Sequence, residues 1–284
     1  LAMRPLIALP KRSVQNRDVR FRSPKNFAVA HDAIALFAMT GRGWNGIRAN
    51  GGLALLVLLT AAAGAGPAFA YRPFDSTDPA VADPGEVEVE LSPVSFRHDN
   101  GGQTWISPQL RLNYGFAQNW EVVLEGQGEH PQSGGSSSAL LDNALSLKYV
   151  AREGSLQEKT GPSLATELGL LLPGLNGESG TGLALAGIAG QKWDWGAIHF
   201  NAAVSLTRER RGGLFFGTIL EGPGDWTVRP VAEFVYEREL GVTETFAALA
   251  GVIWQAKDHL AFDLALRQAS VNGQPETEVR MGLT

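Results

Sequence analysis

Residues 197–207 read AIHFNAAVSLT, and this stretch decides the fold class. Apolar side chains recur at every second position, and polar or small ones stand between them, as His199 does between Ile198 and Phe200. A period of two is that of a β-strand with one apolar and one polar face, because successive side chains of a strand point to opposite sides. The stretch therefore predicts a half-apolar strand and not a helix.

The same alternation recurs along most of the chain after Glu86. Clusters rich in Gly, Asn, Asp and Pro separate the alternating stretches, as tight turns between antiparallel strands require. No stretch of twelve residues has a convincing helical period. The pattern predicts about twelve strands, at 86–98, 104–116, 120–129, 139–152, 162–172, 182–193, 197–208, 213–222, 227–238, 245–256, 260–271 and 277–284.

The composition excludes several kinds of site. The 284 residues include no cysteine, which removes disulfides, zinc–thiolate sites, iron–sulfur clusters and thiol nucleophiles. The mean hydropathy of −0.05 excludes a bundle of transmembrane helices. The histidines lack metal-ligand spacing, and His199 and Ser205 lie about 20 Å apart along one strand. We therefore expect no catalytic residue, no metal and no cofactor.

Charge is distributed unevenly between the two ends of the chain. Residues 1–70 hold 9 basic and 2 acidic residues, whereas residues 71–284 hold 15 basic and 27 acidic ones. A basic nucleic-acid-binding arm in residues 1–38 makes little sense upstream of the export signal described next, so we expect no nucleic-acid partner.

One apolar run, LALLVLLTAAAGAG at 53–66, lies between Arg48 and a small-residue stretch that ends at Ala70. These are the parts of a secretory signal peptide, which we expect to be cut between Ala70 and Tyr71. A signal anchor that stays in the membrane is the alternative. The predicted organisation is an over-extended, disordered N-terminus at 1–38, a signal peptide at 39–70, an N-terminal periplasmic segment at 71–85 and a barrel at 86–284.

Apolar and polar residues alternate in the strands of both a soluble β-sandwich and a membrane barrel. The positions of the aromatic residues help to distinguish these two folds. Tryptophans such as Trp120, Trp193 and Trp254 stand near strand ends, where the girdles of outer-membrane barrels place them. An even strand number and export are also typical of these barrels. We therefore predict an all-β, antiparallel up-and-down transmembrane β-barrel of about twelve strands with its apolar face toward lipid.

Four stretches of the chain resemble one known family. They are YRPFDSTDPAVADPGEVEVELSPVSF (71–96), LRLNYGFAQNWEVVLEG (110–126), EGPGDWTVRPVAEFVYERE (221–239) and LAFDLALRQASVNGQPETEVRMGLT (260–284). Together they resemble the outer-membrane barrel family named for the meta-pathway of phenol degradation, over most of 71–284. The resemblance implies a closed barrel in the outer membrane of a Gram-negative bacterium that takes up small, often apolar compounds.

The end of the sequence departs from this resemblance. Outer-membrane barrels usually finish on an aromatic residue, whereas this sequence ends at Thr284. We expect either further residues or weaker recognition by the barrel assembly machinery.

The polar faces of the predicted strands would line the lumen of such a barrel. The candidate lumen-lining residues are Arg111, Glu121, Glu125, Arg229, Glu233, Asp263, Arg267 and Arg280. Acids and bases inside a barrel should pair, because a buried lone charge is very costly. A narrow, wet pore whose acidic excess disfavours anions and a lumen plugged by salt bridges both remain open, since a twelve-stranded barrel is intermediate in width.

Arg229 and Glu233 share a face of one strand but lie about 13 Å apart, so they cannot pair with each other. We expect Arg229 to pair with Glu221 of the preceding strand or across the lumen. A separate basic cluster, Arg208, Arg210 and Arg211, either contacts lipopolysaccharide phosphates or forms a plain solvated hairpin.

Three functions fit these observations. The first is a monomeric outer-membrane channel or transporter for small, apolar or aromatic solutes, with lipid and lipopolysaccharide around it. The second is a structural or surface-interaction barrel with a closed lumen. The third is an outer-membrane enzyme acting on lipid, which would need a serine, a histidine and a carboxylate or amide together near the outer rim.

Overall fold

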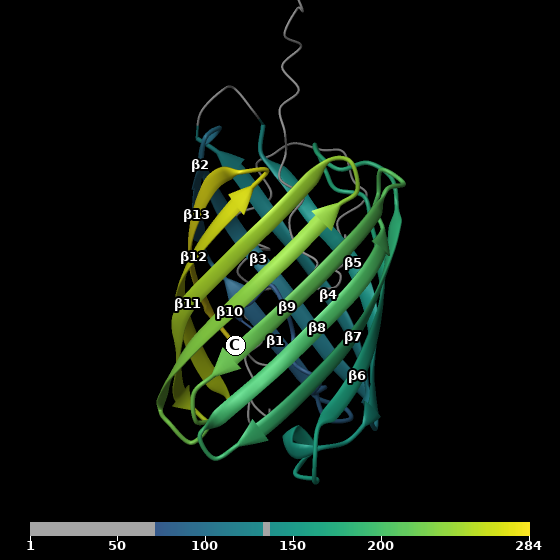
Figure 1. The fold of residues 1–284 in the computed structure, drawn as a ribbon, viewed down its shortest axis with the longest axis vertical. Helices are drawn as coiled ribbons and strands as arrows, with labels where there is room; N and C mark the ends of the chain where they lie inside the picture. The colour runs from purple at the N-terminus through teal and green to yellow at the C-terminus, as the bar shows by residue number, and fades with distance from the viewer. Residues whose placement is uncertain (1–71, 133–136) are drawn as a thin grey trace, which may run out of the picture.

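One antiparallel sheet closes on itself to form a barrel whose strands are inclined to its long axis (Figure 1). The computed structural model describes residues 72–132 and 137–284, so the predicted segments 1–38 and 39–70 lie outside the described residues. The strands are β1 (Val87–Ser92), β2 (Ser95–Asp99), β3 (Gly102–Ala117), β4 (Trp120–Pro131), β5 (Ala139–Arg152), β6 (Ser163–Leu171), β7 (Gly182–Trp193), β8 (Gly196–Leu206), β9 (Gly212–Glu221), β10 (Val228–Glu239), β11 (Thr243–Lys257), β12 (Leu260–Val271) and β13 (Gln274–Leu283).

The first two strand segments together form a single strand of the barrel. Both β1 and β2 pair with β3 in one continuous register, which Ser92 opposite Gln109 and Ser95 opposite Ile106 illustrate. Pro93 separates them, because proline has no N–H to donate to the ladder. The closed barrel therefore has twelve strands, and the prediction of an all-β antiparallel barrel of about twelve strands is confirmed.

Side chains alternate between the outside and the lumen along each strand. On β12 the outward Leu264 is 52% exposed, whereas its inward neighbour Asp263 is 6% exposed. On β10 the outward Phe234 is 57% exposed and the inward Glu233 only 1%. Large apolar side chains outside and ionisable ones inside invert the arrangement of a water-soluble barrel, and this is the surface of a transmembrane one.

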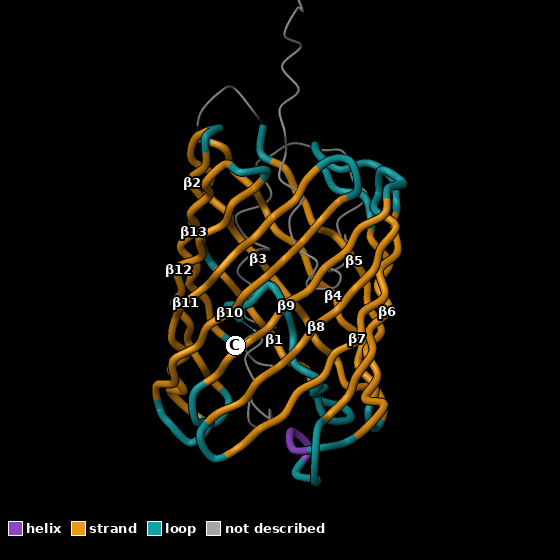
Figure 2. The backbone as a smooth tube through the Cα atoms, in the orientation of Figure 1, coloured by secondary structure: helices purple, strands orange, loops and turns teal. Residues whose placement is uncertain are grey.

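The connections form two rims, which Figure 2 shows in teal at the two ends of the barrel. The rim that we call the turn rim carries the connections at 118–119, 153–162, 194–195, 222–227 and 258–259. A short 3₁₀ turn, Ser155–Gln157, lies there. The opposite rim, which we call the loop rim, carries the described connections at 100–101, 172–181, 207–211, 240–242 and 272–273.

Aromatic side chains gather at the turn rim. Trp120 and Tyr149 pack with ring centroids 4.4 Å apart, and Trp193 stacks on Trp195 at 5.1 Å. Such a girdle suits a membrane interface, where an amphipathic ring meets both lipid and water. The described part of the chain has no helix that is long and apolar enough to cross a membrane.

Candidate functional site

The lumen wall carries more carboxylates than basic groups. Among the described strand residues, twelve buried acids face six buried bases. The acids are Glu90, Glu121, Glu125, Glu129, Asp142, Glu167, Glu233, Glu237, Glu239, Asp263, Glu276 and Glu278, and the bases are Arg97, Arg111, Lys148, Arg229, Arg267 and Arg280. All eight candidate lumen residues thus have buried, inward side chains.

Several of these charges pair across neighbouring strands. Arg111 lies directly opposite Glu125 and Glu90, with its nitrogens 3.2 Å and 3.6 Å from their carboxylate oxygens. Arg229 Nε donates to Glu221 Oε2 at 3.0 Å, which is one of the two kinds of partner that the sequence analysis left open. These pairs hold the wall together without crossing the lumen.

Residues 72–82 belong to the N-terminal segment predicted at 71–85 and lie inside the barrel, whereas Asp83, Pro84 and Gly85 are exposed. We call residues 72–82 the inner segment. Asp75, Ser76 and Thr77 are each no more than 3% exposed and bond to side chains of the lumen wall. The polar groups of these residues thus find partners within the lumen, a position that the predicted periplasmic segment did not include.

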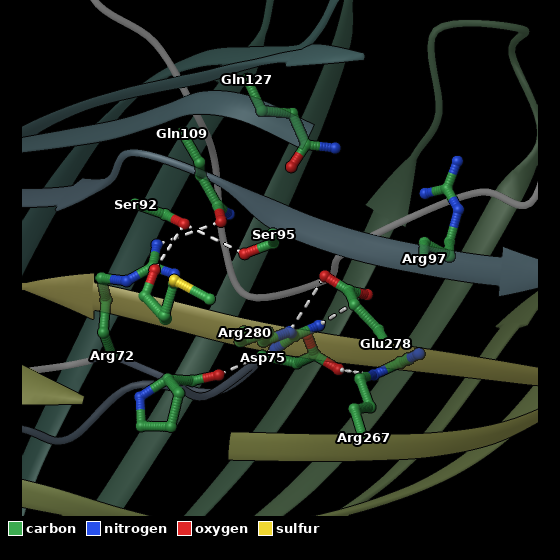
Figure 3. Close-up of polar contacts among 12 residues, drawn as sticks. Arg72, Asp75, Ser92, Ser95, Arg97, Gln109, Gln127, Arg267, Glu278 and Arg280 are labelled. Carbon is green, nitrogen blue, oxygen red and sulfur yellow. Dashed lines mark hydrogen bonds and ion pairs between the residues drawn. The ribbon is translucent and has the colours of Figure 1, made fainter. Parts of the chain in front are cut away.

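Asp75 anchors the inner segment between two arginines, as Figure 3 shows. Its Oδ2 lies 2.7 Å from Arg267 Nε, and its Oδ1 lies 2.7 Å from Arg280 Nη2. Burial alone would raise the pKa of Asp75, but the guanidinium groups of Arg267 and Arg280 outweigh it and hold this pKa below its usual range. Asp75 is therefore a charged group clamped from two strands.

Side chains of the wall also bind the backbone of the inner segment. Glu233 on β10 accepts the N–H groups of Asp75 and Ser76 at 2.8 Å and 2.6 Å. Asn201 on β8 accepts the N–H of Thr77 at 3.2 Å and donates to its carbonyl oxygen at 2.7 Å. The sequence identifies Glu233 as lumenal, but its partners are these backbone groups.

The two ends of the inner segment contact β12 and β3 to β5, whereas its middle contacts β8 and β10. Arg72 donates to Gln109 on β3 at 3.0 Å and lies 3.6 Å from Asp263 on β12. At the other end, Ala82 N–H donates to Glu121 on β4 at 2.7 Å, and Asp78 lies 4.0 Å from Lys148 on β5. The inner segment therefore crosses the lumen and constricts it.

Inward-facing glycines make room for this path. A Cβ added at Gly217 on β9 would meet Ser76, one at Gly190 on β7 would meet Pro79, and one at Gly115 on β3 would meet Ala82. Glycine inside a strand weakens it, so its presence often marks a close approach of another backbone. The wall is thus shaped around the inner segment.

Part of the lumen wall is apolar, which the sequence analysis did not anticipate. One inward cluster on β5 and β7–β10 comprises Ala144, Ala186, Ala203, Phe215 and Val235. A second, smaller cluster of Val231, Ile253 and Ala261 packs against Phe74 of the inner segment. The inward side chains of the wall are therefore both charged and apolar.

The three arginines of the basic cluster differ in their surroundings. Arg208 donates to the carbonyl oxygens of Leu172 and Asn143, both at 2.6 Å, and to Glu178 at 3.2 Å. It holds a neighbouring loop at the loop rim and is not turned toward solvent. Arg210 and Arg211 stay exposed there.

The histidines and carboxylates of the described part of the chain bear on the enzyme and metal hypotheses. No group of three or more His, Asp or Glu side chains in these ranges is placed to hold a metal ion. His130 lies 2.8 Å from Ser138 Oγ, and its other ring nitrogen lies 2.7 Å from the carbonyl oxygen of Ser107. No described carboxylate or amide side chain bonds to that ring, so a serine–histidine–acid arrangement is not formed there.

Comparison with known proteins concerns the fold. No family model matches the chain, and no curated protein matches it. The NanC porin, in a rhombohedral crystal form, superposes with a TM-score of 0.51 and 7% identity over 69% of this chain and 98% of that chain. The KdgM porin, alone and in complex with disordered oligogalacturonate, gives a TM-score of 0.46 at 11% and 12% identity, over 67% of this chain and 98% of that chain. The chain thus has a closed, twelve-stranded antiparallel barrel fold like that of the NanC porin.

Proposed function

We propose that the protein is an outer-membrane channel for small solutes in a Gram-negative bacterium. The observation that carries this proposal is the inverted barrel, with ionisable side chains in the lumen and large apolar ones outside. The fold likeness to a porin and the predicted signal peptide support the location. We expect a monomer that is folded by the barrel assembly machinery.

The lumen wall suggests which solutes pass. Twelve buried strand acids against six bases disfavour anions in general, as a ring of carboxylates does in cation channels. The apolar cluster around Phe215 is buried on the inner side of the barrel, and a solute that displaces what covers it would meet apolar side chains. Small neutral or cationic compounds with an aromatic or apolar part suit this combination, in keeping with the resemblance to the phenol meta-pathway family.

The two rims would face opposite sides of the outer membrane. The inner segment leads into β1 beside the turn rim. A chain exported from the cell interior reaches the outer membrane from the periplasm, so we expect this rim to face the periplasm. The loop rim would then face outward and carry Arg210 and Arg211 toward lipopolysaccharide phosphates, for which arginine is well suited.

Swelling of proteoliposomes tests the function. Liposomes that contain the purified protein should swell in isotonic solutions of small neutral or cationic solutes, and more slowly in those of simple anions of equal size. Liposomes with an unrelated closed barrel are the control. Equal swelling rates with and without the protein for every solute would rule out a channel.

A closed structural barrel is the second candidate, and the inner segment is the observation that favours it. If the segment never leaves its position, the lumen stays constricted and solutes do not pass. The contacts that hold it are mainly polar and ionic, and water or a solute can replace such contacts. This favours a segment that moves.

A further inference from the structure

The inner segment presents an aromatic ring to an apolar part of the lumen wall. Phe74 packs against Val231, Ile253 and Ala261, which come from β10, β11 and β12. Ile253 stands in register between Arg229 and Asp263, so this apolar surface lies within a charged surrounding. Apolar side chains in a wet, charged wall are stabilised only when something apolar covers them, and here Phe74 does so.

The next residue presents a carboxylate to two arginines. Each oxygen of Asp75 contacts a different guanidinium, Arg267 or Arg280, at 2.7 Å. These arginines already have carboxylate partners on β13, Glu276 at 3.0 Å and Glu278 at 3.2 Å. They therefore do not depend on Asp75 for a counter-charge. Convergent guanidinium groups are a common means of binding a carboxylate.

The two contacts belong to adjacent residues, whose Cα atoms are about 3.8 Å apart. Phe74 and Asp75 thus present a ring and a carboxylate, joined by a short flexible chain, to neighbouring surfaces of the wall. We propose that this is a binding site for small aryl carboxylates and that Phe74 and Asp75 occupy it as an internal ligand. An aryl carboxylate that enters the lumen takes their place and displaces the inner segment.

This inference rests on the proposed function and names a solute class for the same lumen. An acid-rich lumen disfavours anions in general, so passage of an anion needs a local site with two cations. The Arg267–Arg280 pair supplies them, and the apolar surface restricts the anions to those with a ring. A simple structural latch has the same contacts but does not respond to ligands, and the experiment below separates the two.

The absence of cysteine allows a single reporter on the inner segment. In the full-length protein with Ala80→Cys, reaction with a maleimide should be slow while the segment is seated and faster once it is displaced. The probe is 3-phenylpropionate. Propionate, which lacks the ring, and 3-phenylpropan-1-ol, which lacks the carboxylate, are matched controls. We expect faster labelling with 3-phenylpropionate and little change with either control at the same concentration.

Substitutions should change the response in opposite directions. Asp75→Asn weakens the binding of the internal ligand. The 3-phenylpropionate concentration for half-maximal labelling should therefore fall at least about tenfold, which corresponds to the loss of one charge-assisted hydrogen bond. Phe74→Ala should also lower the 3-phenylpropionate concentration for half-maximal labelling. This second variant keeps the test valid if Asp75→Asn fails to fold. Arg267→Gln should abolish the response, whereas Arg238→Gln, an exposed outward arginine, should leave it unchanged.

Two results would overturn the proposal. One is an equal response to the ring-free or carboxylate-free control. The other is a weaker response in both Asp75→Asn and Phe74→Ala, as a latch with no ligand site would give. Ion conductance of the same preparations is measured alongside. Ion conductance without a labelling response to the ligand contradicts this inference alone. No conductance from the wild type or any variant contradicts the proposed channel function as well.

Discussion

Replacing Glu233 by glutamine should release the inner segment from the lumen wall. The Glu233 carboxylate accepts two successive backbone N–H groups, at 2.8 Å and 2.6 Å. Glutamine keeps one carbonyl oxygen, which is a neutral acceptor, and places an NH₂ donor where the second N–H needs an acceptor. The variant therefore loses most of the stabilisation from the two charge-assisted hydrogen bonds. Hydrogen bonds to charged groups contribute about 1.5–3 kcal/mol each, which gives a loss of about 2–4 kcal/mol. The ratio of seated to released segment should fall roughly 30- to 700-fold.

Maleimide labelling of Ala80→Cys and single-channel recording both measure this change. Labelling should be faster in Glu233→Gln, and open events should be more frequent. Glu237→Gln is the matched control, because Glu237 is a buried acid on the same face of β10 and forms no hydrogen bond to a described residue of the inner segment. If the two variants behave alike, the segment does not control the lumen through Glu233 and the reasoning is refuted.

Three further substitutions test the faces, the charges and the shape of the barrel. Leu264→Arg, on the outward face, should reduce stability by about 2–4 kcal/mol in lipid, whereas Ser205→Arg, facing the lumen, should cost much less in the same denaturant titration. Arg229→Ala should raise single-channel conductance and move the reversal potential in a salt gradient further toward cations, because one lumenal positive charge is lost. Gly217→Val should displace the inner segment and speed labelling of Ala80→Cys, because a Cβ there meets Ser76, whereas Gly187→Val should not, because a Cβ there meets nothing within 4 Å.

The barrel could be predicted from sequence because its wall obeys a local rule. Along AIHFNAAVSLT the period of two fixes both the strand and its faces, and β8 has Asn201 inside and Phe200 outside as that period requires. The pairing of Arg229 with Glu221 follows from the same geometry, since adjacent antiparallel strands bring such residues together. These features depend on neighbours in sequence or in the next strand.

The position of the inner segment could not be predicted in this way. FDSTDPAVADPGE (74–86) has no periodicity and is rich in proline and aspartate, which is typical of a linker. Its partners, such as Asn201 and Glu233, lie more than a hundred residues away. One signal was available, namely glycines such as Gly190 and Gly217 at inward strand positions, where a close backbone approach is a common cause.

The most direct test of the central claim is single-channel recording of the wild-type protein and Glu233→Gln in planar lipid bilayers. An inverted barrel with an acid-rich lumen and a displaceable inner segment should give discrete conductance steps with a preference for cations, and more frequent ones in the variant. If both proteins are folded and neither gives conductance steps at any voltage, the proposed channel function is contradicted. The hypothesis of a closed structural barrel would then remain.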